Sequence, residues 1–307
     1  MTLPPERETL ATRRQNLVPD APQTSPYLIV LAGIDRGDRH QIFEGALVLG
    51  RSRDECDVCF QDDGISRKHA EVTLARDGTM TARDLGSTNG TLCNNQPLGQ
   101  DPHQLRDGDK LQLGNDVLLE LRFQSALTAN YQQELYSSAV RDPLTGVYNK
   151  GYLLDRMKSE FSFAVRHDCP LALIVLDVDH FKRINDGHGH SAGDEVLKSL
   201  CRRIEVATRQ EDIFARYGGE EFVLLLRDQA LKPALTTAER LRRTVEEHAF
   251  EVAGGSIPVT ISLGVAVATK QGLSSPEALF EAADAALYRA KNTGRNRVCS
   301  PADDPQA

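Results

Sequence analysis

The sequence RYGGEEF at residues 216–222 decides the fold of the region around it. Apolar residues flank it on both sides, and two strand-like runs separated by Gly218 and Gly219 predict a tight hairpin. Glycine adopts the positive φ that such turns need without strain, and its missing side chain lets a phosphorylated group approach the backbone. Two adjacent carboxylates, Glu220 and Glu221, follow the glycines. By itself, this pattern fits a metal–phosphate site and an exposed, charged turn equally well.

A second stretch favours the metal–phosphate site. Residues 171–176 form a continuous apolar run, which predicts a buried central strand, and the run ends in Asp177-Val178-Asp179. Mg²⁺ is held by a few protein oxygens, and substrate phosphates complete its shell. A carboxylate at the end of a buried strand, beside the carboxylates of a neighbouring hairpin, supplies such oxygens.

Four motifs at compatible spacing resemble the GGDEF family of diguanylate cyclases, over about 160 residues. They are DPLTGVYNK at 142–150, DVDHFKRINDGHGHSAGDEVL at 177–197, RYGGEEF at 216–222 and AKNTGRNRV at 290–298. The family's signature here reads GGEEF, with glutamate at its variable third position. The resemblance implies a palm-like α+β domain that condenses two GTP into cyclic di-GMP and releases two pyrophosphates.

The resemblance also implies roles for individual residues. The cation, Mg²⁺ or alternatively Mn²⁺, would be held by Asp177, Glu220 and Glu221, with help from the Val178 carbonyl. These three acids would form the catalytic set, and Glu221 is either the base or a further metal contact. Residues expected to bind the GTP substrate are Phe181, Lys182, Asn185, Asp194, Gly218, Gly219, Lys291 and Arg295. Asn185 and Asp194 would read the guanine edge, while Lys291 and Arg295, expected on one helix end, would face the terminal phosphates.

An Arg-x-x-Asp sequence, Arg209 to Asp212, ends five residues before Gly218. In the family resembled, this spacing is typical of an inhibitory site for the product, and Arg240 would complete it from another face or protomer. We therefore expect feedback by cyclic di-GMP.

Residues 26–123 show a different pattern: short β-prone runs alternate with Gly, Asp and Asn turns, which predicts an all-β sandwich. Polar residues gather in three loops, at residues 50–51, 64–69 and 84–91. Guanidinium, hydroxyl and amide groups together suit a phosphate monoester.

These loops resemble the forkhead-associated (FHA) family, which binds phosphothreonine peptides, over about 95 residues. By that resemblance Arg51, Ser66 and Thr88 contact the phosphate, Arg67 supports them, and Asn89 fixes the peptide backbone. We expect Gly50 and His69 to be architectural. The alternative is an FHA-shaped scaffold that no longer binds phosphate.

The remaining segments complete the expected organisation: a disordered tail at 1–25, a helical linker at 124–141, the cyclase domain at 142–300 and a second tail at 301–307. In the linker, Leu127, Tyr131 and Leu135 recur every four residues and form one stripe. Either this helix lies on one of the domains, or it is a dimer stalk.

Composition limits the function classes. The net charge of −8 argues against general nucleic-acid binding, and no apolar run is long enough to span a bilayer. The N-terminus has no apolar signal region, and six scattered cysteines fit a reducing cytoplasm, where Cys56 and Cys59 are structural thiols.

We expect a homodimer, because each active site holds one GTP and two must react. The expected phosphothreonine ligand is a partner protein or the chain's own tail, at Thr2, Thr9, Thr12 or Thr24, modified by an upstream Ser/Thr kinase. Two other functions remain open: a silent GGDEF domain that only senses nucleotide, and an FHA adaptor that recruits partners.

Overall fold

The computed structural model describes residues 24–303, except 34–35, 61, 63, 210–211, 254, 270–271 and 274. The chain divides into two compact units, residues 1–134 and 135–307, which are described separately. Residues 1–23 and 304–307 of the expected tails lie outside the described part. Two boundary predictions were wrong. Thr24 and Ser25 belong to the first strand, and Pro301–Asp303 form a 3₁₀ turn rather than part of a tail.

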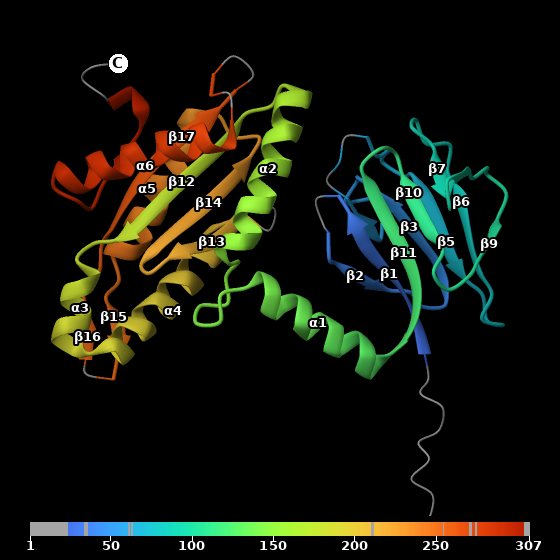
Figure 1. The fold of residues 1–307 in the computed structure, drawn as a ribbon, viewed down its shortest axis with the longest axis horizontal. Helices are drawn as coiled ribbons and strands as arrows, with labels where there is room; N and C mark the ends of the chain where they lie inside the picture. Colours follow the sequence, from blue (N-terminus) through green and yellow to red (C-terminus); the bar gives the residue numbers. More distant parts are fainter. Residues whose placement is uncertain are drawn as a thin grey trace, which may run out of the picture. The chain divides into compact units, whose positions relative to one another are not determined.

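The first unit is a sandwich of two sheets, seen as two layers in Figure 1. One sheet has the order β2-β1-β11-β10-β7-β8, formed by Arg39–Gln41, Thr24–Ala32, Val117–Ser125, Lys110–Leu113, Thr91–Cys93 and Gln96–Pro97. The other has the order β4-β3-β5-β6-β9, formed by Val58–Cys59, Gly45–Gly50, Ala70–Leu74, Met80–Asp84 and His103–Leu105.

Alternating side chains build the core between these two sheets. In β1, Leu28 and Val30 are buried while their neighbours are partly exposed, as expected for a strand with one covered face. Leu111 and Leu119, from β10 and β11, join the same core with Phe60. The sandwich predicted from the sequence is confirmed.

Helix α1, Ala126–Val140, follows β11 directly and corresponds to the predicted linker helix. Its stripe is exposed: Leu127, Tyr131 and Leu135 have exposed fractions of 81%, 60% and 52%.

The second unit has a central sheet of order β13-β14-β12-β17-β18, formed by Ile213–Gly218, Glu221–Arg227, Leu171–Val178, Ile261–Ala268 and Val298–Cys299. Neighbouring strands are antiparallel, except that β18 runs parallel to β17. Every residue of the central strand β12 is buried, as its apolar run predicted.

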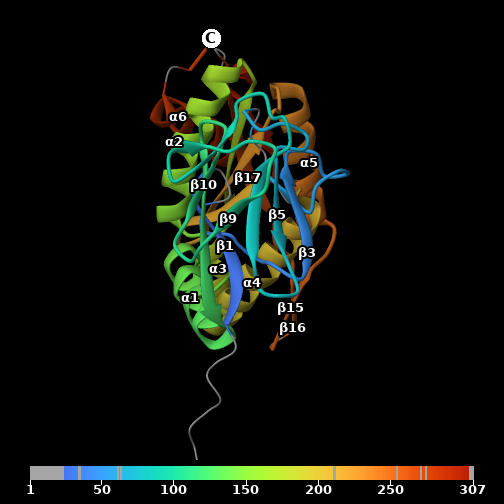
Figure 2. The ribbon, with the colours of Figure 1, turned by 90° about the vertical axis from the view of Figure 1, so that its right-hand side faces the viewer.

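Helices cover both faces of this sheet (Figures 1 and 2). One apolar core includes α2, Lys150–His167, and α6, Pro276–Asn292. The other core includes α3, Phe181–His188, α4, His190–Ala207, and α5, Leu231–Glu246, next to a small hairpin of β15, Phe250–Val252, and β16, Gly255–Ile257. Successive residues of β12 alternate between these cores, so the expected α+β domain is confirmed.

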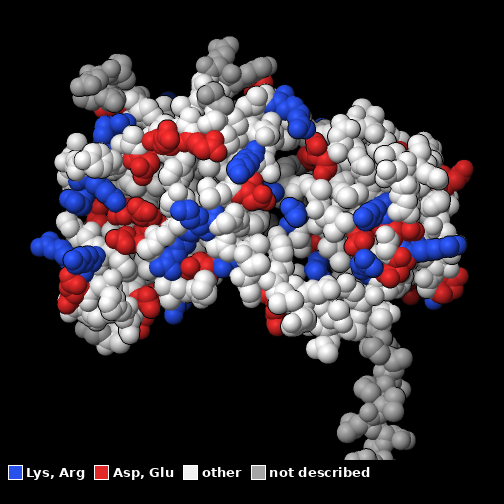
Figure 3. Space-filling model, in the orientation of Figure 1, with Lys and Arg blue, Asp and Glu red and all other residues white. Residues whose placement is uncertain are grey.

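Charged side chains of both signs are interspersed on the face that Figure 3 shows. The ion pairs of the first unit include Arg76 with Glu44 at 2.7 Å and Arg83 with Glu71 at 2.8 Å. Within the described ranges, no helix combines the length and apolar character needed to cross a membrane.

Candidate active site and phosphate-binding loops

The hairpin predicted from RYGGEEF is formed by β13 and β14. Gly218 ends β13 and pairs with Glu221 after a bulge, so the turn itself is Gly219-Glu220. Of the two glycines only Gly219 has a positive φ, at 49°. A Cβ added to either glycine would meet no atom within 4 Å, so the backbone at this tip is accessible.

Arg216 braces this turn, and the sequence analysis assigned it no role. Its guanidinium donates to the Gly219 carbonyl at 2.9 and 2.7 Å and forms an ion pair with Asp142 at 3.1 Å. Thr145 also donates to the Asp142 carboxylate. Burial would raise the pKa of Asp142, but the bonds from Thr145 and Arg216 outweigh it and lower that pKa. The motif at 142–150 therefore supports the hairpin. This contact could not be predicted from the sequence, because the two motifs lie far apart along the chain.

Three carboxylates lie together at one end of the sheet, and we call Asp177, Glu220 and Glu221 the acidic edge. Asp177 and Glu221 are register partners on β12 and β14, and the Val178 N–H donates to the Glu220 carbonyl at 3.3 Å. Burial raises the pKa of Asp177 to about 6 in spite of Lys291, and the charges of Glu220 and Glu221 add to the rise.

A cation already lies at this edge. The Lys291 ammonium is 2.7 Å from the Asp177 carboxylate, in a pair whose side chains are 28% and 10% exposed. Among the described residues, no group of three or more His, Cys, Asp or Glu is placed so that it could hold a metal ion. The acidic edge nevertheless fits Mg²⁺, because its donors are hard oxygens and Mg²⁺ needs only one or two carboxylates when phosphates supply the rest.

Lys291 and Arg295 do not share a helix end, so that expectation was wrong. Helix α6 ends at Asn292, and Arg295 lies beyond it in a left-handed conformation with a φ of 60°. The Arg295 N–H donates to the Ala290 carbonyl at 2.9 Å, which turns the chain back over the helix end.

The expected guanine readers come from α3 and α4. A Cβ on Gly193 would lie 2.0 Å from the Asn185 side-chain oxygen and 3.1 Å from the Phe181 ring. Only glycine therefore allows this close approach, which places Asn185 against the residue before Asp194. Phe181 is buried, whereas Lys182 is exposed to solvent.

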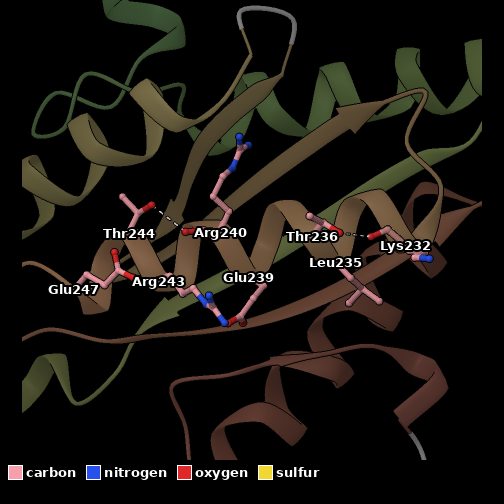
Figure 4. Close-up of a pocket in the computed structure, with 8 residues that line it drawn as sticks. All are labelled: Lys232, Leu235, Thr236, Glu239, Arg240, Arg243, Thr244 and Glu247. Atoms are coloured by element: carbon pink, nitrogen blue, oxygen red, sulfur yellow. Dashed lines mark hydrogen bonds and ion pairs between the residues drawn. The ribbon is translucent and has the colours of Figure 1, made fainter.

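The three residues of the expected product site lie around the C-terminal end of α4. The Asp212 carboxylate accepts from the Arg209 N–H at 2.9 Å, and the Arg240 guanidinium donates to the Ala207 carbonyl at 2.8 Å. Figure 4 shows the Arg240 side chain extending from α5, away from Glu239 and Arg243. Arg240, expected from another face or protomer, thus also lies at this end of α4 within the one chain.

In the first unit, His69 joins the three polar loops, residues 50–51, 64–69 and 84–91, which we call the FHA loops. His69 is fully buried, its Nδ1 accepts from the Ser66 N–H at 3.0 Å, and its Nε2 donates to the Gly90 carbonyl at 3.0 Å. Burial lowers the pKa of His69, which favours this neutral ring. A Cβ on Gly50 would lie 2.1 Å from the Arg67 carbonyl, so Gly50 allows a close crossing of the loops.

The expected phosphate contacts line one pocket of about 390 Å³, formed by Arg51, Glu55, Ser66, Arg67, Lys68 and Thr88. The Thr88 N–H donates to the Ser66 hydroxyl at 3.0 Å, and the Asn89 amide donates to the Gly64 carbonyl at 2.8 Å. Sequence reasoning missed Glu55, whose carboxylate lies 3.9 Å from Arg67 and 4.0 Å from Lys68.

Comparison with known proteins agrees with this architecture. The family model described as "Diguanylate cyclase, GGDEF domain" matches residues 139–297, just over half of the chain. The chain belongs to the GGDEF domain family. The model of the FHA domain matches residues 47–114, so an FHA domain precedes the GGDEF domain.

Several relatives share the GGDEF domain. Diguanylate cyclase DgcP of Pseudomonas aeruginosa is 42% identical over 169 residues, which are 55% of this chain and 25% of the relative. Response regulator PleD of Caulobacter vibrioides is 39% identical over 204 residues, which are 66% of this chain and 43% of the relative. The match thus spans less than half of either relative.

Solved structures show the same fold. The coiled coil and GGDEF domain of DgcB from Caulobacter crescentus, in complex with c-di-GMP, has a TM-score of 0.53 and 30% identity over 56% of this chain and 91% of that chain. Diguanylate cyclase SiaD from Pseudomonas aeruginosa, in complex with its activator SiaC, has a TM-score of 0.51 and 37% identity over 56% of this chain and 65% of that chain.

Proposed function

We propose that this protein is a diguanylate cyclase that converts two GTP into cyclic di-GMP and two pyrophosphates. The observation that carries the proposal is the acidic edge. Asp177 and Glu221 lie opposite each other on neighbouring strands, and the Asp177 carboxylate forms an ion pair with the Lys291 ammonium. A site that binds a cation beside accessible glycine backbone suits a nucleoside triphosphate with its metal ion. The similarity to relatives named diguanylate cyclase supports the same activity.

In this reaction the ribose 3′-hydroxyl of each GTP attacks the α-phosphorus of the other, so two phosphodiester bonds form, both bonds to pyrophosphate break, and each hydroxyl loses its proton. Bound Mg²⁺, or Mn²⁺ in its place, neutralises the phosphate charge. Asp177, Glu220 and Glu221 would hold it with the Val178 carbonyl, and Glu221 is the candidate to receive the proton. Gly218 and Gly219 leave room for the phosphates. Phe181 and Lys182 line their entrance.

The guanine base would lie against α3 and α4. The Asn185 amide and the Asp194 carboxylate suit the edge of guanine, which donates from N1 and N2 and accepts at N3. Lys291 and Arg295 would bind the terminal phosphates. For Lys291 this requires exchange of its present partner Asp177 for the substrate.

Two protomers must face each other, because each site binds one GTP and the product contains two. The exposed stripe of α1, at Leu127, Tyr131 and Leu135, is a candidate for the contact between them. A transient dimer is sufficient for this chemistry.

Incubation of the full chain with GTP and Mg²⁺, followed by chromatography, tests the activity. We expect one cyclic di-GMP for two pyrophosphates, and loss of product in a Glu221→Gln variant that still melts like the parent. GTP binding without any product would instead establish a nucleotide sensor and overturn the proposal.

We further propose that the FHA domain binds a phosphothreonine peptide and thereby changes how the two catalytic domains meet. Its pocket combines the Arg51 and Arg67 guanidinium groups with the Ser66 and Thr88 hydroxyls, which suits a phosphate monoester. Asn89 would fix the peptide backbone. The ligand is a partner protein or a phosphorylated threonine of residues 1–23, produced by a Ser/Thr kinase. The fourth candidate, Thr24, is the exposed first residue of β1. Equal binding of phosphorylated peptides to the parent and to Arg51→Ala would refute this recognition.

Product feedback is the third proposal. Cyclic di-GMP would bind at Arg209, Asp212 and Arg240, which surround the end of α4. We expect an Arg209→Ala variant to keep its initial rate and lose inhibition by added product. Unchanged inhibition in this variant would show that cyclic di-GMP does not inhibit through this site.

A further inference from the structure

Asp179 is the second acid of the 177–179 motif, and it is not among the residues proposed to bind the metal ion or the nucleotide. Its side chain is buried with 5% of the residue exposed, and it accepts three hydrogen bonds. The Ser262 hydroxyl donates to Oδ1 at 2.6 Å, while the Thr260 hydroxyl at 2.7 Å and the Asn296 backbone N–H at 3.0 Å donate to Oδ2. Both oxygens are therefore engaged by the protein.

Asn296 is held from a second side as well. Its side-chain oxygen accepts from Arg242 at 2.7 Å, and its amide nitrogen donates to Glu246 at 2.6 Å. Both partners lie on α5, whereas Asp179 follows β12. Two other segments thus contact this one residue after α6.

The backbone at this point needs such support. Arg295 and Asn296 have φ values of 60° and 45°, so two successive residues other than glycine are left-handed. This conformation is unfavourable for residues with a Cβ and persists where the surrounding structure enforces it. Asn296 donates to Asp179 and Glu246 and accepts from Arg242, and these hydrogen bonds supply that enforcement.

We propose that Asp179 is a positioning residue for the GTP phosphates, acting through Asn296 on Arg295. The inference rests on the proposed function for its substrate, and it assigns Asp179 no contact with nucleotide or metal. Asp177 in β12 contacts Lys291 near one end of the motif AKNTGRN, and Asp179 just after β12 contacts Asn296 at the other end.

The two attachments differ in how easily they exchange. The Lys291 ammonium is part-exposed and can leave Asp177 for a phosphate. The Asp179 carboxylate holds a backbone N–H in a buried site, where an unmade hydrogen bond is costly. Asp179 therefore keeps Arg295 in place while Lys291 moves to the substrate.

A double-mutant cycle with α,β-methylene GTP, an analogue that cannot react, tests this role in the full chain. We expect Asp179→Ala to weaken binding about ten- to a hundredfold, and Arg295→Ala to weaken it similarly. The double variant should bind no more weakly than the weaker single variant, because both changes remove one effect. Additive losses would overturn the proposal.

Hydrogen exchange supplies a readout that does not depend on nucleotide. The Asn296 amide should exchange faster in Asp179→Ala than in the parent, whereas Glu160→Gln, a change at a buried acid on the opposite face of the sheet, should leave it unchanged. Equal exchange in Asp179→Ala and the parent contradicts the proposal.

If Asp179→Ala does not fold, the combined Thr260→Val and Ser262→Ala variant replaces it. That variant leaves the carboxylate with Asn296 as its remaining partner, and we expect an intermediate loss of analogue binding. If the parent protein makes no cyclic di-GMP, the proposed cyclase activity is refuted. The hydrogen-exchange experiment would still test whether Asp179 holds the Asn296 amide.

Discussion

The FHA loops and the acidic edge are suited to ligands of opposite charge, and they are built differently. In the FHA loops, polar groups satisfy one another: His69 joins Ser66 to Gly90, Asn89 donates to the Gly64 carbonyl, and the buried Asp84 carboxylate accepts from Ser87 and Thr91. At the acidic edge, Asp177 is buried beside two further carboxylates, and its pKa is raised to about 6.

Because of this difference, the charged residues of the two sites are expected to affect the stability of their units differently. The FHA loops keep their shape through these internal hydrogen bonds, so the exposed Arg51 and Arg67 side chains can change without unfolding the loops. The acidic edge carries charge that the fold itself disfavours and that a cation would stabilise. Sites of the second kind lose function and gain stability when the charge is removed.

The largest effect is expected from Asp177→Asn. We expect cyclase activity to fall about a thousandfold, because a bound metal contributes several kcal/mol to such a reaction. The pKa of Asp177 is higher in the folded state than its ordinary 3.8, so its favourable contribution is complete below pH 3.8 and is lost as the pH rises through about 6. At neutral pH the variant should therefore melt no lower than the parent.

Calorimetry with and without Mg²⁺ checks this pair of expectations. Mg²⁺ should raise the melting temperature of the parent and of Glu251→Gln, a change at an exposed acid, but not of Asp177→Asn. A variant that is both inactive and strongly destabilised would show that the acidic edge is structural.

The sequence predicted these two regions to different depths. A long apolar run identified β12, and glycine identified the hairpin, because each signal is local. Strands of two or three residues, such as β4, β8 and β9, escaped detection because pairing with a neighbouring strand defines them.

Charged partners far apart in the chain were also unpredictable. Asp142 with Arg216 and Asp177 with Lys291 depend on how the sheet brings their elements together. The left-handed Arg295 shows the limit of helical spacing, since the helix ends three residues before it. Motif resemblance singled out Asp177, Lys291 and Arg295, whereas only the fold shows what each one contacts.

Glu55→Gln should give the second largest effect, and its direction is a gain. The Glu55 carboxylate shares the pocket of Arg51 and pairs with Arg67 and Lys68, so it competes with a phosphate for these cations. We expect phosphothreonine peptide to bind about three- to tenfold more tightly, since pairs at partly exposed sites contribute up to about 1 kcal/mol. Titration by fluorescence anisotropy measures this, with Glu44→Gln as a control at an acid paired to Arg76 instead. Weaker binding would mean that Glu55 orients Arg67 for the ligand.

The smallest effect is a dependence of FHA stability on pH. Burial lowers the pKa of His69 in the folded state, so the unfolded chain takes up a proton at a higher pH than the folded one. The contribution of His69 is therefore complete above about 6.5 and is lost as the pH falls through the folded-state pKa. We expect the calorimetric midpoint of the first unit to fall by a few degrees between pH 7.5 and 5.5.

In His69→Gln, which cannot titrate, that midpoint should be lower at neutral pH and less sensitive to acid. The control His103→Gln, a change at an exposed histidine of the same unit, should behave like the parent. An identical pH slope in the parent and His69→Gln would show that acid acts on the FHA loops through other groups.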